Sequence, residues 1–301
     1  MKKNNFNKNF FKIFLFHGVI KKNYDIRNYT KKHILEKKFI KKIKFLKKKY
    51  NILSLNQILY LIKNNKHFPS NTCAITFDDG FENNYSIAAP ILEKFKIPTT
   101  FYFSTDFINN NTMSWIDKIE YTFEKTKKTK VLLPWNKKPL EINNKKNKIF
   151  VLDQIRKKLK NKNKNSIIEK VVNDIFKQLQ VKKIISLNGE LDKKISWSKV
   201  KKLNCSDLFT IGGHSHRHIS LTSVSLKEAK IEIDKSIRLF KKKIGINLQH
   251  YSYPEGQKID FNLAIKKHLK MRGINICPTA MHGSNNTKSK LFNLKRISIN
   301  V

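Results

Sequence analysis

Two short stretches of the sequence carry side chains that can bind a metal ion and transfer a proton. One is TFDDG at residues 76–80, and the other is GHSHRH at residues 213–218. A carboxylate and two imidazoles four residues apart can hold a divalent ion and leave coordination positions open for water and substrate. A second carboxylate can then take a proton from a water molecule at the metal. These residue types predict hydrolytic chemistry, with one carboxylate as ligand and the other as base.

Each stretch alone also has an interpretation without chemistry. Asp-Asp-Gly is common in turns, and histidines can pack in a protein core. Here, however, three of the nine histidines lie within five residues, and both stretches follow a short apolar run. The combination favours a metal site over a turn and a packed histidine cluster.

Short apolar runs bounded by turn residues predict the strands that position these side chains. The predicted strands are residues 10–20, 73–77, 98–103, 208–213, 249–253, 273–277 and 294–299. The predicted helices are residues 31–50, 54–62, 83–95, 226–242 and 261–270, and those over 31–50 and 226–242 are amphipathic. Strands that alternate with helices indicate a parallel α/β architecture, in which side chains that follow neighbouring strands gather at one edge of the sheet.

Residues about 108–200 interrupt this alternation. Clusters of lysine separate apolar stretches such as residues 116–123 and 167–179. We interpret this segment as a mostly helical, lysine-rich insertion that forms a lid or a small subdomain. The prediction is therefore one catalytic domain over residues 1–301, a length that can bury a large core.

The two chemical motifs and their surroundings resemble those of the polysaccharide deacetylase family, the NodB-like carbohydrate esterases of family 4. TFDDG is similar to the family's first motif, and HSHRH is similar to its second, H-[ST]-x-x-H. Residues 16–19 resemble the N-terminal YHxV strand of many members, residues 220–242 the helix after the second motif, and residues 251–256 the YPxG version of the third motif. The resemblance covers residues 10–105 and 200–301.

The resemblance implies a distorted (β/α) barrel of the NodB deacetylase type, carrying the helical lysine-rich insertion, with its site at the carboxyl ends of the strands. By motif position, Asp79, His214 and His218 would hold a divalent metal, usually Zn²⁺. Asp78 would be the general base. The metal would polarise the acyl carbonyl and steady the tetrahedral intermediate.

The third motif departs from the pattern of much of the family. The resemblance gives Tyr253, Pro254 and Glu255 a part in substrate and oxyanion binding, the latter through the backbone N–H of Glu255. The common form R-x-P-Y has an arginine two residues before the proline and an aromatic residue after it. Glu255 replaces that aromatic residue here, and we expect its negative charge to discourage anionic substrates.

Four further residues stand out beside the motifs. Arg296 is similar to an arginine of this subgroup that orients the base, and a surface arginine is the alternative. His17 is expected in a supporting or packing role rather than as a ligand. His282 is a candidate for the histidine that protonates the leaving amine, and a plain loop residue is the alternative. Trp115 belongs to a stretch that resembles a Trp-Asp signature of members linked to surface-glycan loci, with simple packing as the alternative.

The charge of the chain is strongly positive, with 63 basic against 22 acidic residues and a formal net charge of +41. Only six of the basic residues are arginines, and asparagine and isoleucine are abundant, as expected from a genome rich in A and T. Proteins that recognise nucleic-acid sequence depend on arginine for bidentate contacts. We therefore expect no specific nucleic-acid partner, and only weak, salt-sensitive attraction to anionic surfaces such as membranes.

Two other features bear on the place of the protein in the cell. No run of about 18 uncharged apolar residues predicts a transmembrane helix, and the N-terminus lacks the long apolar core of a signal peptide. The three cysteines show no CxxC pattern. These observations favour a cytoplasmic protein.

The sequence thus predicts a hydrolase acting on carbon–nitrogen bonds other than peptide bonds. Its substrate would be an acetylated carbohydrate, and the reaction would remove an acetyl group, N-linked, from an amino sugar of a glycan or glycan precursor. One alternative is a deformylase or amidase on another small acylated substrate. The other is a non-catalytic basic binding protein on the same fold, which the intact set of Asp78, Asp79, His214 and His218 disfavours.

Overall fold

The computed structural model describes residues 9–160, 165–181 and 189–299, so part of the N-terminal segment considered above lies outside the described residues. The main sheet runs in the order β10–β1–β5–β6–β9, with β11 paired to β1 and β4 paired to β5. Its strands are β1 (Phe10–Phe16), β4 (Asn51–Ile52), β5 (Thr72–Phe77), β6 (Thr99–Phe103), β9 (Phe209–Gly213), β10 (Asn285–Asn286) and β11 (Ile297–Ser298). Because β1, β5, β6 and β9 are parallel, their carboxyl ends share one face of the molecule.

Irregular segments close this sheet into a barrel. Backbone hydrogen bonds join β9 to residues 249–252, these to residues 275–279, and these in turn to residues 291–296. The ring is completed where the Ile299 N–H donates to the Leu15 carbonyl in β1, at 2.9 Å. The expected distorted (β/α) barrel is thereby confirmed, although the predicted strands near the C-terminus are reduced to isolated bridges and short pairs.

Side chains that alternate along the strands build two apolar layers, as the two-residue period of a strand requires. The inner layer fills the barrel and comprises Phe11, Ile13, Ala74, Tyr102, Ile276 and Leu294, closed by Leu55 and Ile58 of α2 (Leu55–Lys63). The outer layer comprises Phe14, Phe16, Ile75, Phe77, Phe101 and Phe103 and packs against the surrounding helices.

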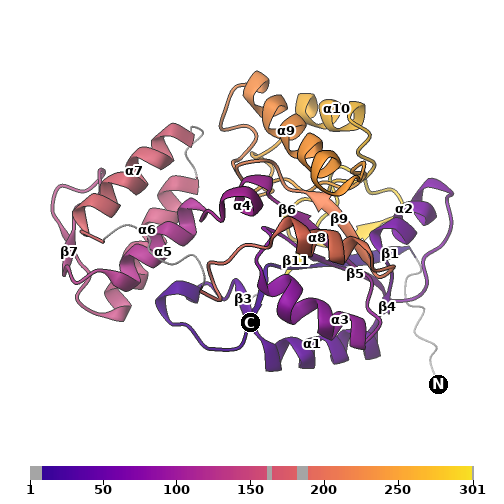
Figure 1. Cartoon of the computed structure of the whole chain (residues 1–301), viewed down its shortest axis with the longest axis horizontal. Coiled ribbons are helices and arrows are strands. Elements are labelled where there is room, and N and C mark those ends of the chain that lie inside the picture. Colours follow the sequence, from indigo (N-terminus) through magenta and orange to yellow (C-terminus); the bar gives the residue numbers. More distant parts are fainter. Residues whose placement is uncertain (1–8, 161–164, 182–188, 300–301) are drawn as a thin grey trace.

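Helices cover the outside of the barrel. In Figure 1, α1 (Glu36–Lys49) and α3 (Ala89–Lys94) lie on one side of the strands, and α9 (Leu226–Ile244) and α10 (Leu263–Met271) lie on the other. Two further helices, α4 (Thr105–Asn110) and α8 (Trp197–Asn204), come directly before and after the lysine-rich segment in the chain. None of the helices in the described ranges is long and apolar enough to cross a lipid bilayer.

The helix predicted over residues 31–50 begins later than expected. His33–Leu35 form β3, which pairs in parallel with β2 (Gly18–Ile20), and α1 starts only at Glu36. This pairing gives the backbone N–H and C=O groups of β2 hydrogen-bond partners. The gain outweighs the preference of the first residues of the segment for a helix.

The segment between α4 and α8 has an apolar cluster of its own. It contains α5 (Trp115–Lys125), α6 (Lys145–Lys160), α7 (Asn165–Gln178) and the short hairpin of β7 (Lys130–Val131) and β8 (Leu140–Glu141). Figure 1 places these elements together at one side of the barrel. Their shared cluster includes Ile119, Phe123, Val151, Ile155 and Ile175. We refer to residues 111–181 as the insertion.

Buried charged side chains join the insertion to the barrel. Asp117 of α5 lies 2.9 Å from the Lys32 Nζ and 3.6 Å from the Lys194 Nζ. Beside them, Glu120 lies 3.7 Å from Arg156. Burial, assisted by the negative charge of Asp117, raises the pKa of Glu120 to about 8. Burial also lowers the pKa of Lys194 to about 8.

The raised pKa of Glu120 predicts a loss of stability with rising pH. In the folded protein Glu120 keeps a proton that an unfolded glutamate, with a pKa of 4.5, releases. Its contribution is therefore lost between pH 4.5 and 8, with a slope of up to about 1.4 kcal/mol per pH unit. Glu120→Gln should be less stable than, or equal to, the parent at pH 5, and should gain on it by pH 8.5 in urea unfolding. Glu124→Gln, on the same helix, is the control, and an equally pH-dependent difference there would contradict the assignment.

Candidate metal centre

Two strand ends deliver the chemical side chains to one place. Asp78 and Asp79 directly follow β5, and His214 directly follows β9. Asp79 has a φ of 77° and Gly80 a φ of 90°, so the chain turns sharply after the strand. A side chain at Gly80 would meet Phe103 at 2.9 Å, which favours glycine at this turn. The turn keeps both carboxylates at the mouth of the barrel.

Asp79, His214 and His218 form a group that can bind a metal ion. Each offers one ligand atom, and these atoms lie within 4.8 Å of one another. The Asp79 Oδ1 lies 3.1 Å from the His218 Nε2 and 3.7 Å from the His214 Nε2. The loop between the histidines folds back because Ser215 and His218 have φ values of 61° and 56°, and the Ser215 Oγ accepts from the His218 N–H at 3.0 Å. An Asp-His-His donor set of this kind suits zinc and similar divalent ions.

The surroundings of His214 fix how its ring is used. Its Nδ1 lies 2.9 Å from the Ser252 carbonyl oxygen, which can only accept, so Nδ1 carries the hydrogen. The lone pair of Nε2 therefore faces Asp79 and His218. Burial lowers the pKa of His214 to about 4, which keeps the ring neutral and able to act as a ligand.

The other two members of the group, Asp79 and His218, interact electrostatically with each other. Burial opposes the charge on Asp79, but His218 and Lys32 hold the pKa of its carboxyl well below the usual range. Burial likewise opposes a charge on His218, and the Asp79 carboxylate outweighs it, so the pKa of His218 is raised. The Asp79 carboxylate thus attracts positive charge, and a divalent ion would balance its charge more fully than the single proton on His218.

Asp78 lies beside the ligand group, with its Oδ2 3.8 Å from the His214 Nε2, and is paired with a buried arginine. Arg296, 1% exposed, donates from Nη1 to the Asp78 Oδ1 at 2.8 Å and from Nη2 to the Asp78 Oδ2 at 2.7 Å. Its Nε donates to the Thr279 carbonyl at 2.6 Å, which fixes the plane of the guanidinium. Burial opposes the charge on Asp78, but Arg296 and His214 hold the pKa of Asp78 below its usual value. Asp78 is therefore an oriented carboxylate next to the metal group.

These side chains line a cavity of about 210 Å³ between barrel and insertion. The barrel supplies Asp78, Asp79, His214, His218, His17 and Tyr253. The insertion supplies Ser114, Ile116, Arg156 and Lys160. The cavity thus has the metal group at one wall and cationic side chains of α6 at another.

The third-motif residues lie at the rim of this cavity. Tyr253 is buried, and its hydroxyl donates to the Phe292 carbonyl at 3.3 Å, away from the metal group. Pro254 is also buried. Burial opposes the charge of Glu255, but the Lys160 Nζ at 3.1 Å lowers its pKa. Because this lysine offsets the carboxylate, the charge argument against anionic substrates is weaker than the sequence suggests.

The supporting candidates lie in different surroundings. His17 follows β1 and lines the cavity, and burial lowers the pKa of its ring. His282 is exposed, pairs through its backbone with Arg296, and does not line the cavity. His216 turns to the Thr105 Oγ1, at 2.8 Å from its Nδ1. The structure thus brings His17 and Arg296 to the site and leaves His282 outside it.

Lys32 is a member of the site that sequence reasoning missed. Its Nζ lies 3.5 Å from the Asp79 Oδ2 and lines the cavity. Burial opposes its charge, but Asp117 and Asp79 raise the pKa of Lys32 well above its usual value, so it is a permanent cation. The sequence does not distinguish Lys32 from the many other lysines of the chain. Its partner Asp117 belongs to the Trp-Asp stretch, which was the only part of this group that the sequence singled out.

Comparison with known proteins identifies a family model that fits most of this architecture. The model described as polysaccharide deacetylase matches residues 65–145 and 162–274, together more than half of the chain. A curated relative, the poly-beta-1,6-N-acetyl-D-glucosamine N-deacetylase of Staphylococcus aureus (strain MSSA476), is 35% identical over 96 residues. That match covers 32% of this chain and 32% of the relative, so it spans about a third of the curated protein's length.

Solved structures share the fold over nearly the whole chain. The Streptococcus pyogenes deacetylase PplD in complex with acetate has a TM-score of 0.61 at 14% identity, covering 97% of this chain and 92% of that one. IcaB from Ammonifex degensii has a TM-score of 0.62 at 14% identity, with the same coverage of 97% and 92%. At these identities the likeness concerns the fold, which is the NodB-type barrel.

The ligand geometry predicts the metal content of variants. Purified protein should carry about one divalent ion per chain, and His214→Ala or His218→Ala should lose most of it. The loss should exceed the 10–100-fold weakening typical of losing a residue that only orients a ligand. Elemental analysis after dialysis measures this, with His216→Ala as the control that keeps its metal. Full metal content in both ligand variants would show that the ion binds elsewhere.

The Arg296–Asp78 pair predicts a change in the pH profile. Arg296→Lys keeps a positive charge but loses the bidentate contact, so the pKa of Asp78 should rise toward its ordinary value. The acid limb of kcat/KM should move to higher pH, and activity at neutral pH should fall by about tenfold, less than the roughly 10²–10⁴-fold expected from losing the base. Arg272→Lys, which alters an exposed bidentate pair with Asp234, is the control. An unshifted acid limb would mean that Arg296 has a structural role only.

Proposed function

The chain belongs to the polysaccharide deacetylase family, and from this premise we propose that it hydrolyses the N-acetyl group of an amino sugar in a glycan or glycan precursor. The observation that carries the proposal is the placement of an ionised carboxylate, Asp78, beside an Asp-His-His metal group in one cavity. We further propose that the resident ion is zinc. The match to a poly-N-acetylglucosamine deacetylase supports a polymer of N-acetylglucosamine as the substrate class.

Each residue of the cavity has a separate role in the proposed reaction. A divalent ion held by Asp79, His214 and His218 would supply Lewis acidity at the acyl carbonyl and lower the pKa of water. Asp78 takes the proton of the attacking water, because Arg296 keeps this carboxylate ionised and oriented. The water oxygen bonds to the carbonyl carbon, the carbon–nitrogen bond breaks, and acetate and a free amine leave.

A proton must then reach the leaving nitrogen. We assign this step to Asp78, which holds the proton taken from water and can return it to the nitrogen, because burial lowers the pKa of His17 and leaves that ring neutral although it lines the same cavity. His282, the sequence-based candidate, is exposed and outside the cavity lining. Lys32, fixed by Asp117, adds a positive charge on the same wall and limits repulsion between the two neighbouring carboxylates.

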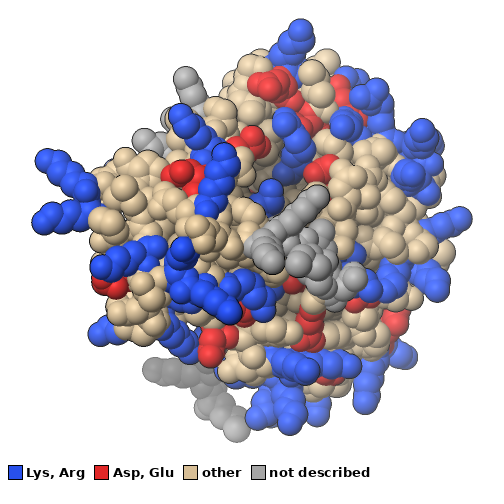
Figure 2. Space-filling model, turned by 60° about the vertical axis from the view of Figure 1, so that its left-hand side comes forward, with Lys and Arg blue, Asp and Glu red and all other residues tan. Residues whose placement is uncertain are grey.

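The surface charge supports general rather than specific attraction to polyanions. Figure 2 shows lysine and arginine side chains spread over the whole visible face rather than gathered along one stripe. A diffuse field of this kind is screened within about 10 Å at 0.1 M salt. We therefore propose an acetylated carbohydrate as the substrate and no specific nucleic-acid partner.

The activity test is acetate release from N-acetylglucosamine, its linked oligomers and N-formyl analogues, with and without a chelator. We expect release from the acetylated sugars, its loss with chelator, and its return with added divalent ion. Asp78→Asn should keep the ion and lose activity by about 10²–10⁴-fold, the usual contribution of general acid–base catalysis.

Other outcomes would point to other functions. Preferential hydrolysis of the N-formyl analogues would identify a deformylase. Binding of the sugars without turnover by the metal-loaded parent protein would identify a binding protein that retains the fold.

A further inference from the structure

The two oxygens of the Asp79 carboxylate have different surroundings. Its Oδ1 lies 3.1 Å from the His218 Nε2 and 3.7 Å from the His214 Nε2. Its Oδ2 lies 3.5 Å from the Lys32 Nζ. A carboxylate can give a metal ion one oxygen or both, so the neighbour of Oδ2 affects how many ligand atoms the metal group offers.

Lys32 is held in this position from two sides. Its Nζ lies 2.9 Å from the Asp117 Oδ1. Its backbone is fixed through the next residue, because the buried Asn28 side chain accepts from the His33 N–H at 2.9 Å and donates to the His33 carbonyl at 2.8 Å. The ammonium group of Lys32 therefore lies between Asp117 and Asp79.

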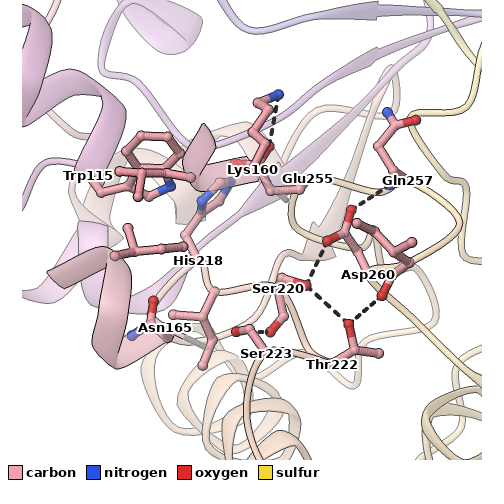
Figure 3. A pocket seen from close by; sticks show the side chains of 14 residues that line it. Trp115, Lys160, Asn165, His218, Ser220, Thr222, Ser223, Glu255, Gln257 and Asp260 are labelled. Carbon is pink, nitrogen blue, oxygen red and sulfur yellow. Dashed lines mark hydrogen bonds and ion pairs between the residues drawn. The ribbon is translucent and has the colours of Figure 1, made fainter. Parts of the chain in front are cut away.

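Asp117 reaches Lys32 from the insertion. It lies in the first turn of α5, where the Ser114 Oγ accepts from the Asp117 N–H at 3.1 Å and fixes the start of the helix. Figure 3 shows Trp115, the first residue of α5, on the same side of a cavity as His218. The start of α5 thus lies beside the metal group, and the insertion determines where the Lys32 ammonium lies.

Asp117 has a second cation at its other oxygen. The Lys194 Nζ lies 3.6 Å from the Asp117 Oδ2 and 3.5 Å from the centre of the Phe81 ring. Burial opposes the charge on Asp117, but Lys32 and Lys194 hold the pKa of its carboxyl well below the usual range. Lys32 lines the metal cavity, whereas Lys194 lies outside its lining. The same carboxylate therefore pairs with one lysine that reaches Asp79 and with one that is buried away from the cavity.

An ammonium group at Oδ2 changes what Asp79 offers to a metal ion. The positive charge repels a divalent cation from that side, and the repulsion is strong where water is excluded. Oδ1, next to the two histidines, then remains the oxygen that a metal can reach. Catalytic zinc sites have three protein ligands and keep a further position for water or substrate. A second oxygen from Asp79 would fill such a position.

We propose that Asp117 is a positioning residue for the metal centre: it holds the Lys32 ammonium against the Asp79 Oδ2, so that Asp79 gives a metal ion one oxygen only. The insertion thereby controls how many coordination positions stay open, although the metal group itself belongs to the barrel. This assigns a role to the acidic residue of the Trp-Asp stretch. The proposal rests on the metal site of the proposed function, and not on the identity of the substrate.

Cobalt(II) in place of zinc tests this arrangement, because its visible absorption is strong in four-coordinate sites and weak at higher coordination numbers. Lys32→Met frees the Asp79 Oδ2, so the absorption of the cobalt-loaded variant should fall below that of the parent. Asp117→Asn, which releases Lys32, should change the spectrum in the same direction. Lys194→Met is the matched control, because it removes the other buried partner of Asp117 and should keep the parent spectrum.

Zinc affinity and activity separate a positioning role from a structural one. In Lys32→Met, acetate release by the zinc-loaded protein should fall by roughly 10–100-fold, the usual effect of losing a group that orients a metal ligand. Zinc affinity, measured by competition with a chromophoric chelator, should stay the same or rise, because a positive charge beside the ion is gone. A fall in affinity that parallels the fall in activity would overturn the proposal.

A double variant tests whether Asp117 acts through Lys32. Lys32→Met combined with Asp117→Asn should match Lys32→Met alone in spectrum and activity, as expected of two residues in one network, and additive losses would contradict the proposal. Where Asp117→Asn fails to fold, Asp117→Glu displaces the same carboxylate and should shift the spectrum toward that of Lys32→Met. Lys32→Arg, whose guanidinium also covers Oδ2, should keep the parent spectrum.

The spectrum and the activity test this inference and the proposed function separately. A cobalt spectrum that depends on Lys32 and Asp117, in a protein that releases no acetate, would reject the deacetylase function and keep the inference. Acetate release by the parent, with equal cobalt spectra in the parent and in folded Lys32→Met, would reject the inference alone. An equal spectral change in Lys32→Met and Lys194→Met would also overturn it, because the cause would then be a general loosening of the insertion.

Discussion

The buried pair of Arg296 and Asp78 is the interaction on which the site depends. Two charges placed inside a barrel lose their hydration, and removing one partner of such a pair typically costs about 3–5 kcal/mol. The pair is tolerated because its hydrogen bonds are complete: Arg296 also donates to the Thr279 carbonyl and the Ser252 hydroxyl. Barrel closure makes this arrangement possible, since the segment carrying Arg296 must return beside β1 to reach the end of β5. Fold and chemistry are therefore coupled, because this oriented carboxylate of lowered pKa exists only in the closed barrel.

The insertion acts on the site through charge as well as shape. Asp117 holds Lys32 next to Asp79 and is also near Lys194, whose ammonium lies 3.5 Å from the centre of the Phe81 ring. Through Arg156 and Lys160, the same insertion forms a wall of the metal cavity. The insertion, which has its own apolar cluster, thus contributes charged side chains to the wall of this cavity, so the shape of the cavity depends on how the insertion packs against the barrel.

The sequence was enough to predict the features that follow from local pattern. Apolar runs that end in Asp78-Asp79 and in His214 predict strands whose carboxyl ends meet, and the structure places these residues together. Features that depend on contacts between residues far apart in the chain could not be predicted from local sequence patterns. His33–Leu35 pair with β2 rather than extending α1, and no local signal distinguishes Lys32 or Lys194 from other lysines. The His282 loop could be judged only once the barrel had shown which loops face the cavity.

Because the chain carries a large positive net charge, cation binding depends on where its few carboxylates lie. With 63 basic against 22 acidic residues, the long-range field repels a divalent cation. That field comes largely from exposed side chains and is screened over about 10 Å at 0.1 M salt, whereas Asp79 acts at contact distance in a buried site where screening is weak. Four of the six arginines are likewise paired with carboxylates, at Asp192, Glu232, Asp234 and Asp78. A lysine-rich composition can therefore make most of the surface basic and still leave a buried carboxylate, Asp79, in a group that can bind a metal ion.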